Sequence, residues 1–177
     1  MTKEHPIIFN TAMMQALIAG RKTQTRRLGN SPLRKVQVGD KLWVRETLIH
    51  GGYFGAPIAY AADHKYSHYK WPSHWKRHCR PSIHMPRWAS RITLTVTDVR
   101  LQRLQDITEE DVIAEGISEC DGLFDDVQYC QYTNEMGLVF GDSKPMYRQL
   151  WASLYGKGSW DANPEVVALT FEVEVRE

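Results

Sequence analysis

The chain has 177 residues, of which 42% are hydrophobic and 24% are charged, and its net charge is +1. These values are typical of one soluble globular domain with a substantial core, and they exclude an intrinsically disordered chain. Because the net charge is so small, any binding to nucleic acid has to depend on local patches of positive charge.

The cysteines and the lengths of the apolar runs indicate in which cellular compartment the protein is expected. The three cysteines form no CxxC pair, and their odd number argues against a disulfide framework. No run of about 18 apolar residues is present, and residues 1–10 lack the apolar core of a signal peptide. We therefore expect no membrane span and a reducing, cytoplasmic location.

The residue pattern in the first half of the chain predicts three strands and one helix. Residues 6–9 form a short apolar run that is typical of a first strand. Asn10 or Thr11 can cap a helix, since the apolar residues that follow recur at i, i+3 and i+4. Apolar and polar residues then alternate clearly at 42–45 and weakly towards 53–60, which predicts two more strands.

The second half contains the clearest strand signal, a strict alternation of apolar and polar residues within 91–104. A capping box predicts a short helix over 108–116. A longer helix is predicted to begin at Asp142 or Ser143, and a last strand covers 166–175.

The order of these elements indicates the fold class. Strands and helices do not alternate as parallel βαβ units, which favours an α+β fold with a small mixed sheet or barrel and peripheral helices. No internal repeat, low-complexity tract or linker divides the chain, so we expect a single domain over 1–177.

Residues 63–90 differ in character from the rest of the chain. They hold five of the seven histidines and three of the six tryptophans, and prolines interrupt any regular backbone pattern. We therefore predict an irregular, basic and aromatic segment. Histidines at i, i+4 spacing raise the alternative of a zinc site, but no CxxC or HExxH pattern accompanies them, so we expect no metal.

The side chains of this segment suit single-stranded or looped RNA, because aromatic rings stack on bases and arginines contact phosphates. The residues expected to bind RNA there are Arg77, Arg80, Arg87 and Trp88. The alternative is that the tryptophans are core residues that pack the segment against the sheet.

A basic run follows Gly20, the expected end of the first helix. It contains Arg21, Lys22, Arg26 and Arg27, four positive charges within seven residues, with threonines between them. In a loop these side chains would form an anion-attracting surface for a substrate or nucleic acid. The alternative is a solvated basic loop with no ligand.

Glu46 follows Arg45 at the end of a predicted strand. A carboxylate at the mouth of a barrel can contact the edge of a base, which makes Glu46 a candidate binding residue. The alternative is an ion pair with Arg45 or Arg27.

Four segments together resemble the ASCH family, a branch of the PUA-like β-barrel superfamily. They are Ala-Gly-Arg-Lys-Thr-x-Thr-x-Arg at 19–27, Val-Gly-Asp at 38–40, Ile-Thr-Glu-Glu at 107–110 and Ala-Leu-Thr-Phe at 168–171. The whole chain is also similar to ASCH-like proteins that phages and prophages encode. The resemblance implies an α+β fold, a PUA-like (ASCH) mixed β-barrel with peripheral helices, extended by insertions at about 50–90 and 118–142.

Small bacterial ASCH proteins are N4-acetylcytidine amidohydrolases, in which a lysine, a threonine and a glutamate carry the chemistry. The matching positions here are Lys22, Thr25 and Glu115, so the resemblance implies that these residues are catalytic, that the partner is a modified nucleoside or RNA, and that no cofactor is used. Amide hydrolysis needs a nucleophile, a base and a stabilised oxyanion. Thr25 would attack once Lys22 had removed its proton, with Glu115 protonating the leaving amine or holding Lys22 in place.

Alternatives from other classes stay open at this point. One is a non-catalytic RNA-binding module, and a less supported one is RNA cleavage around Lys22 and Arg27. A purely structural reading makes Lys22 and Glu115 an ion pair that ties the basic run to the short helix.

The position of Glu115 leads to a geometric expectation. It falls in the last turn of the helix predicted over 108–116, where the negative end of the helix dipole disfavours a carboxylate unless a cation compensates. We therefore expect Glu115 to face Lys22 or Arg27 across a cleft. We also expect Glu115→Gln to remove activity and leave the fold intact.

Overall fold

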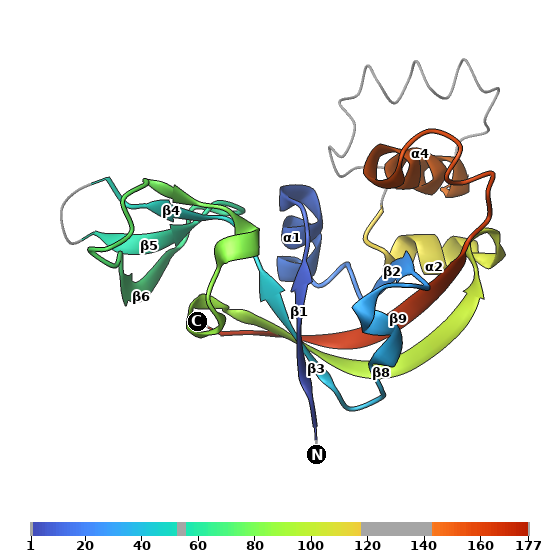
Figure 1. The fold of residues 1–177 in the computed structure, drawn as a ribbon, viewed down its shortest axis with the longest axis horizontal. Coiled ribbons are helices and arrows are strands. Elements are labelled where there is room, and N and C mark those ends of the chain that lie inside the picture. Colours follow the sequence, from blue (N-terminus) through green and yellow to red (C-terminus); the bar gives the residue numbers. More distant parts are fainter. Residues whose placement is uncertain (1, 53–55, 118–142, 177) are drawn as a thin grey trace. The chain divides into compact units, whose positions relative to one another are not determined.

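The computed structural model describes residues 2–52, 56–117 and 143–176 (Figure 1). The chain divides into two compact units. Unit 1 comprises Met1–Gly20, Val36–Asp98 and Phe171–Glu177, and unit 2 comprises Arg21–Lys35 and Val99–Thr170. The expectation of a single domain over 1–177 stays a prediction, and the insertion expected at about 118–142 lies outside the described residues.

Unit 1 contains most of the strands and one helix. In chain order its own elements are β1 (Glu4–Ile8), α1 (Thr11–Ile18), β3 (Lys41–Arg45), β4 (Leu48–His50), β5 (Pro57–Tyr60), β6 (Tyr66–Lys70) and β7 (Cys79–Arg80). Two longer strands, β8 (Ile92–Arg103) and β9 (Glu165–Val175), supply residues to both units. Unit 2 itself contains β2 (Gln24–Leu28), α2 (Glu109–Ala114) and α4 (Lys144–Tyr155).

The main sheet of unit 1 is mixed, with strand order β1-β3-β8-β9. β1 lies parallel to β3, and β3 lies antiparallel to β8 with Leu42 opposite Leu94. Both leucines are fully buried, and Val44 is buried as well, whereas Trp43 between them is half-buried. This alternation confirms the strand predicted at 42–45, and the strand predicted within 91–104 is β8. The fold class is α+β, as the order of elements indicated.

The helix α1 begins and ends where the sequence predicted. The Asn10 side chain accepts a hydrogen bond of 2.8 Å from the Met13 backbone N–H, which satisfies one of the free donors at the N-terminus. Gly20 follows with a φ of 73°, a left-handed conformation that glycine adopts without steric cost.

A second sheet in unit 1, with strand order β6-β5-β4-β7, corrects the prediction of an irregular segment in part. Within 63–90 only Tyr66–Lys70 and Cys79–Arg80 are strand, and most of the rest of the segment is irregular. The sequence hid β6 because its residues Tyr66–Lys70 carry polar and aromatic side chains that alternate between exposed and half-buried, with no apolar face. Trp71 and Trp75 are half-buried and pack on one side against a buried cluster around Leu48 and Met85, which is part of what the core alternative expects.

In unit 2, β2 pairs antiparallel with β9, so that Gln24 lies opposite Thr170 and Leu28 opposite Val166. The basic run had been predicted as a loop, and this is wrong for residues 24–28. The prediction failed because arginines at a strand position obscure the apolar alternation on which strand prediction depends. Lys22, Gln24, Thr25 and Arg26 are all buried, which also excludes the solvated-loop alternative for them.

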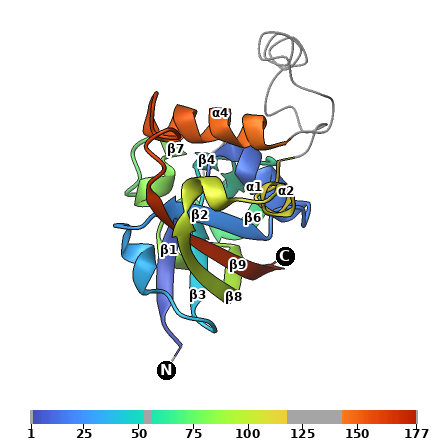
Figure 2. The same ribbon diagram turned by 90° about the vertical axis from the view of Figure 1, so that its right-hand side faces the viewer.

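The helices α2 and α4 complete unit 2 and pack against each other (Figure 2). The Thr108 side chain accepts a 3.2 Å hydrogen bond from the Asp111 backbone N–H, and the Asp111 side chain accepts one in return from Thr108, which confirms the predicted capping box. α4 begins after Ser143, while Asp142 lies outside the described residues. No helix within 2–52, 56–117 and 143–176 is long and apolar enough to span a membrane.

Candidate functional site

Lys22 and Glu115 form a buried ion pair in unit 2. Lys22 Nζ lies 2.8 Å from Glu115 Oε2 and donates a second hydrogen bond of 2.7 Å to the Glu115 backbone oxygen. Lys22 is 1% exposed and Glu115 is 4% exposed. The backbone positions the pair, because the Thr23 N–H donates to the Ala114 carbonyl at 2.8 Å and so joins the segment before β2 to the end of α2.

Arg26 extends this pair into a network. Its Nη1 donates to Glu115 Oε1 at 3.2 Å and to Gln24 Oε1 at 2.6 Å, and its Nη2 lies 2.6 Å from Asp111 Oδ2. Asp111 also accepts from Arg100 Nη2 at 2.9 Å. Gln24 and Arg26 share one face of β2 because side chains on a strand alternate.

The two carboxylates come from one face of the helical segment, since Asp111 and Glu115 are four residues apart. Both carboxylates therefore pair with buried cations from residues 22–26. Glu115 pairs with Lys22 and Arg26, and Asp111 pairs with Arg26. The charges of the buried groups balance, which is the condition for burying ionised side chains at all.

Burial shifts the pKa values in this network. Loss of solvation lowers the pKa of Lys22 below its usual 10.5, although the negative charge of Glu115 opposes that shift. Burial works to raise the pKa of Asp111, but the hydrogen bond from Arg100 and the charge of Arg26 leave it below its usual value. Burial and the nearby Glu115 charge raise the pKa of Tyr147 well above 10.0. Tyr147 therefore stays protonated, and its hydroxyl contacts Glu115 Oε1 at 3.4 Å as a donor.

The expected contact between Glu115 and Lys22 is present, whereas Thr25 has a different partner. Thr25 Oγ1 accepts a 2.7 Å hydrogen bond from Arg27 Nη1, and both residues occupy the alternate positions of β2. The alternation of side chains along β2 thus places the Thr25 hydroxyl on the opposite face of the strand from Arg26. Arg21, also expected to bind substrate, is exposed. The catalytic and binding roles of these residues stay predictions.

Glu46, in unit 1, forms an ion pair, but with neither of the expected arginines. Arg91 Nε and Nη2 each donate to one Glu46 oxygen at 2.9 Å, a bidentate arrangement. Arg91 Nη1 donates to Asp63 Oδ2 at 2.9 Å. Burial raises the pKa of Glu46 above its usual value, and this outweighs the opposing effect of Arg91. The ion-pair alternative for Glu46 is therefore confirmed, but its predicted partner, Arg45 or Arg27, is wrong, because the partner is Arg91.

The predicted RNA-binding residues of unit 1 have varied surroundings. Arg87 forms a bidentate ion pair with Glu4, at 2.9 and 3.0 Å. The Arg80 guanidinium carbon lies 4.1 Å from the centre of the Trp75 ring. Trp88 is 42% exposed and stacks on Trp75 at 5.9 Å between ring centres. Within the described ranges, no three His, Cys, Asp or Glu side chains are placed to hold a metal ion.

Comparison with known proteins gives one likeness in structure. The chain is similar to the crystal structure of protein EF3133 from Enterococcus faecalis V583, described as family-model DUF984, with 12% sequence identity and a TM-score of 0.43. The alignment covers 98% of this chain and 81% of that chain. A likeness at this level carries no conclusion about activity. No family model and no curated protein matches the chain.

Several residues of the charged networks are not candidates from the sequence, namely Gln24, Asp63, Arg91, Arg100, Asp111 and Tyr147. Asp111 had a signal, since it lies one helical turn before Glu115 on the same face. Arg91 and Tyr147 had none, because each meets its carboxylate partner across a large separation in sequence, 45 and 32 residues respectively. Only the fold brings such residues together.

Proposed function

We propose that this protein binds a modified nucleoside or RNA and hydrolyses N4-acylated cytidine at the Lys22–Glu115 pair. The setting is a PUA-like (ASCH) fold in a cytoplasmic protein of the phage and prophage type. The observation that carries the proposal is the 2.8 Å contact between two buried ionisable groups, at the positions that the ASCH resemblance marks as catalytic.

The pair can supply both proton transfers that amide hydrolysis needs. A water oxygen forms a bond to the acyl carbon, and Glu115 takes the proton that the water loses. The bond between that carbon and the exocyclic nitrogen breaks, and Lys22 donates a proton to the leaving amine. The products are the free carboxylic acid and cytidine.

The 2.8 Å contact then restores the starting state, because Glu115 can return its proton directly to Lys22. The lowered pKa of Lys22 makes its ammonium a better proton donor than an exposed lysine would be. Arg26 and Tyr147 both contact Glu115 Oε1, which leaves Oε2 to face Lys22. Because both groups are covered, turnover also requires a movement that admits the substrate.

The first test is turnover of N4-acetylcytidine by the purified protein, followed as release of cytidine by chromatography. Lys22→Met is expected to lower kcat by about a hundredfold or more, the usual contribution of a positioned proton-transfer group. Lys35→Met is the matched control, since Lys35 is exposed in the same unit. Absence of turnover by the unaltered protein, or equal rates in the two variants, would contradict the proposal.

A substitution of Thr25 distinguishes the two possible nucleophiles, a water molecule and the Thr25 hydroxyl. We infer water rather than the Thr25 hydroxyl, since that hydroxyl accepts a hydrogen bond from Arg27, and both residues lie on the opposite face of β2 from Arg26. Thr25→Ala is therefore expected to retain turnover within about tenfold of the unaltered protein, well short of the loss that removing a covalent nucleophile causes. A loss as large as that of Lys22→Met would restore Thr25 as the nucleophile.

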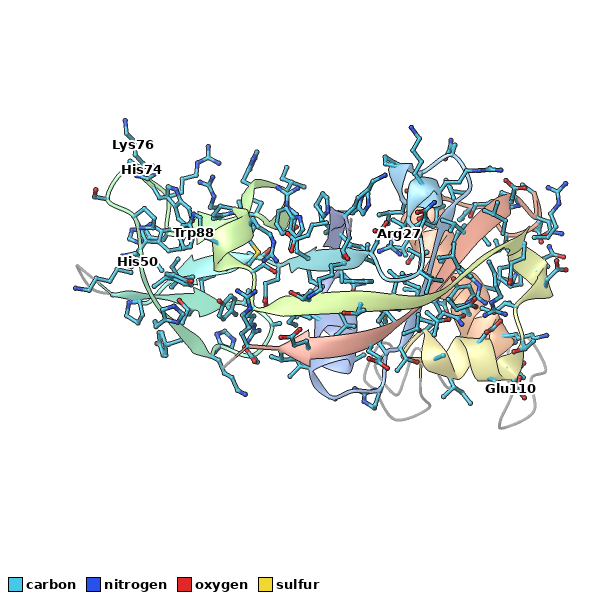
Figure 3. All side chains as sticks on the ribbon, turned by 90° about the horizontal axis from the view of Figure 1, so that it is seen from below. Arg27, His50, His74, Lys76, Trp88 and Glu110 are labelled. Atoms are coloured by element: carbon cyan, nitrogen blue, oxygen red, sulfur yellow. The ribbon has the colours of Figure 1, made fainter. Side chains whose placement is uncertain are left out.

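A second candidate function, RNA binding without catalysis, is supported by a hollow of about 480 Å³ in unit 1. Trp71, Trp75, Lys76, Arg77 and Arg80 line it, and none of its lining residues in the described chain is a carboxylate. Figure 3 shows two of its lining residues, His74 and Lys76, which project from the chain between β6 and β7. Cations beside aromatic rings suit the phosphates and bases of a single strand.

Neutralising the three cations, Lys76, Arg77 and Arg80, by alanine tests RNA binding. If each contacts a phosphate, the slope of log affinity against log salt becomes shallower by about 2 for a single strand. A fluorescently labelled oligoribonucleotide titrated at several salt concentrations measures the slope, with Lys35→Met again as control. An unchanged slope in the triple variant would remove this surface as the binding site.

A further inference from the structure

Unit 1 holds another hollow, of about 420 Å³, that neither proposal above uses. Its lining includes Tyr66, Tyr69, Trp88, Asp63 and Arg91, with the cations Lys65 and Arg176. A volume of this order lies in the usual range of small-molecule sites, roughly 300–1,000 Å³. The lining combines aromatic side chains with charged and polar ones, so it can both stack on a ligand and form hydrogen bonds with it.

Arg91 is a polar lining residue of this hollow whose side chain is held in place by other residues of the protein. It is 7% exposed, and three of its N–H groups donate to Glu46 and Asp63. Its guanidinium carbon also lies 3.9 Å from the centre of the Tyr60 ring. A guanidinium has five N–H groups, so two of them have no acceptor among the described residues. Its position is therefore held by the protein, while donor capacity is left for a ligand.

Asp63 places an acceptor beside these donors. Its Oδ2 accepts from Arg91 Nη1 at 2.9 Å, and its Oδ1 accepts from the Lys65 backbone N–H at 3.1 Å. Each carboxylate oxygen can accept one more hydrogen bond. The hollow thus offers a donor next to an acceptor, and the hydrogen-bonding edge of every nucleobase presents the complementary pair.

The aromatic lining is unusually open to solvent. Tyr66 is 64% exposed and Trp88 is 42% exposed, although large aromatic rings are normally buried to a greater extent. Tyr69 holds Trp88 from one side by an edge contact of 5.0 Å between ring centres. Exposed rings beside a polar pocket provide the faces on which a planar base stacks.

Two exposed cations complete the hollow. Lys65 and Arg176 line the hollow as exposed cations, and the charge of each also acts on a nearby carboxylate, Asp63 and Glu4 respectively. The backbone anchors Arg176 there, because its N–H donates to the Arg91 carbonyl at 2.8 Å. A phosphate is the anion that such cations bind beside a stacked base.

We propose that this hollow binds a nucleoside phosphate, free or as one nucleotide of an RNA strand. The base edge hydrogen-bonds to Arg91 and Asp63, the ring stacks on Tyr66, and the phosphate contacts Lys65 and Arg176. The site lies wholly within unit 1 and does not depend on the Lys22–Glu115 pair, which belongs to unit 2.

Calorimetric titration of the full chain with the four nucleoside 5′-monophosphates, and separately with a single-stranded tetraribonucleotide, tests the site. We expect saturable binding in at least one of these arms. Tyr66→Ala and Lys65→Ala should each weaken it by about tenfold, and Tyr66→Phe should keep it, since the ring provides the stacking face. Both residues are exposed, so the variants are expected to fold.

Lys70→Ala is the matched control, because Lys70 is an exposed lysine on the same strand as Tyr66 and does not line the hollow. Binding of monophosphates identifies the ligand as a free nucleotide, and binding of the tetraribonucleotide alone identifies it as a nucleotide of RNA. The absence of binding in every arm overturns the proposal. So does binding that Tyr66→Ala and Lys65→Ala leave unchanged.

Discussion

Glu115→Gln is expected to destabilise the protein by about 3–5 kcal/mol, the usual consequence of removing one partner of a buried ion pair. Glu115 accepts hydrogen bonds from Lys22, Arg26 and Tyr147, and it is 4% exposed. A neutral amide leaves Lys22 buried without the carboxylate that balances its charge. The sequence had placed Glu115 on a cleft wall, where the same change would leave the fold intact. Its burial reverses that expectation for stability.

Urea unfolding followed by circular dichroism measures this loss. The double variant Lys22→Met/Glu115→Gln is the control, because it removes both charges and leaves Arg26 paired with Asp111. It should recover part of the stability, as replacing a whole buried pair is far less harmful than breaking it. A loss below about 1 kcal/mol in the single variant would mean that the pair is hydrated and not buried.

The second large effect is expected in unit 1, where Arg91→Met removes the partner of Glu46. Burial already raises the pKa of Glu46 above its usual 4.5 while Arg91 is present, so loss of Arg91 raises this pKa further. A carboxyl group with a raised folded-state pKa binds more protons in the folded state than in the unfolded state. The contribution of Glu46 to stability is then fully present below about pH 4.5 and is lost as the pH rises through the folded-state pKa.

We therefore expect Arg91→Met to cost about 3–5 kcal/mol at pH 8 and clearly less at pH 5, where Glu46 takes up a proton. Urea unfolding at both pH values measures the difference between this variant and the unaltered protein. Adding Glu46→Gln removes the titrating group and should make the loss nearly independent of pH. A loss of equal size at both pH values in Arg91→Met would show that Glu46 does not take up the proton.

Local signals explain which parts of the fold could be predicted. Helix caps act within a few residues, so the cap at Asn10 and the capping box at Thr108 were readable directly. The alternation that predicts β8 is also local, because it reflects one buried face of a strand. Helix electrostatics predicts that Glu115 meets a cation, Lys22 or Arg27, and the structure shows the contact with Lys22.

The parts that could not be predicted depend on partners distant in sequence. β2 carries arginines at positions where strand prediction expects apolar residues, and Arg26 is stable there only because Asp111 and Glu115 meet it from α2. β6 and β7 follow the same rule, since these short polar strands are held by pairing with β5 and β4.

The sequence by itself determined the α+β class and most helix and strand positions, and for Glu115 it indicated only that a cation, Lys22 or Arg27, faces it. Only the tertiary structure decided that this pair is buried, that Thr25 bonds to Arg27 on the other face of β2, and that Glu46 pairs with Arg91. The physical reason is the separation along the chain over which each kind of interaction acts. Caps and periodicity act between neighbours along the chain, whereas burial and charge pairing are set by residues that folding brings together from far apart.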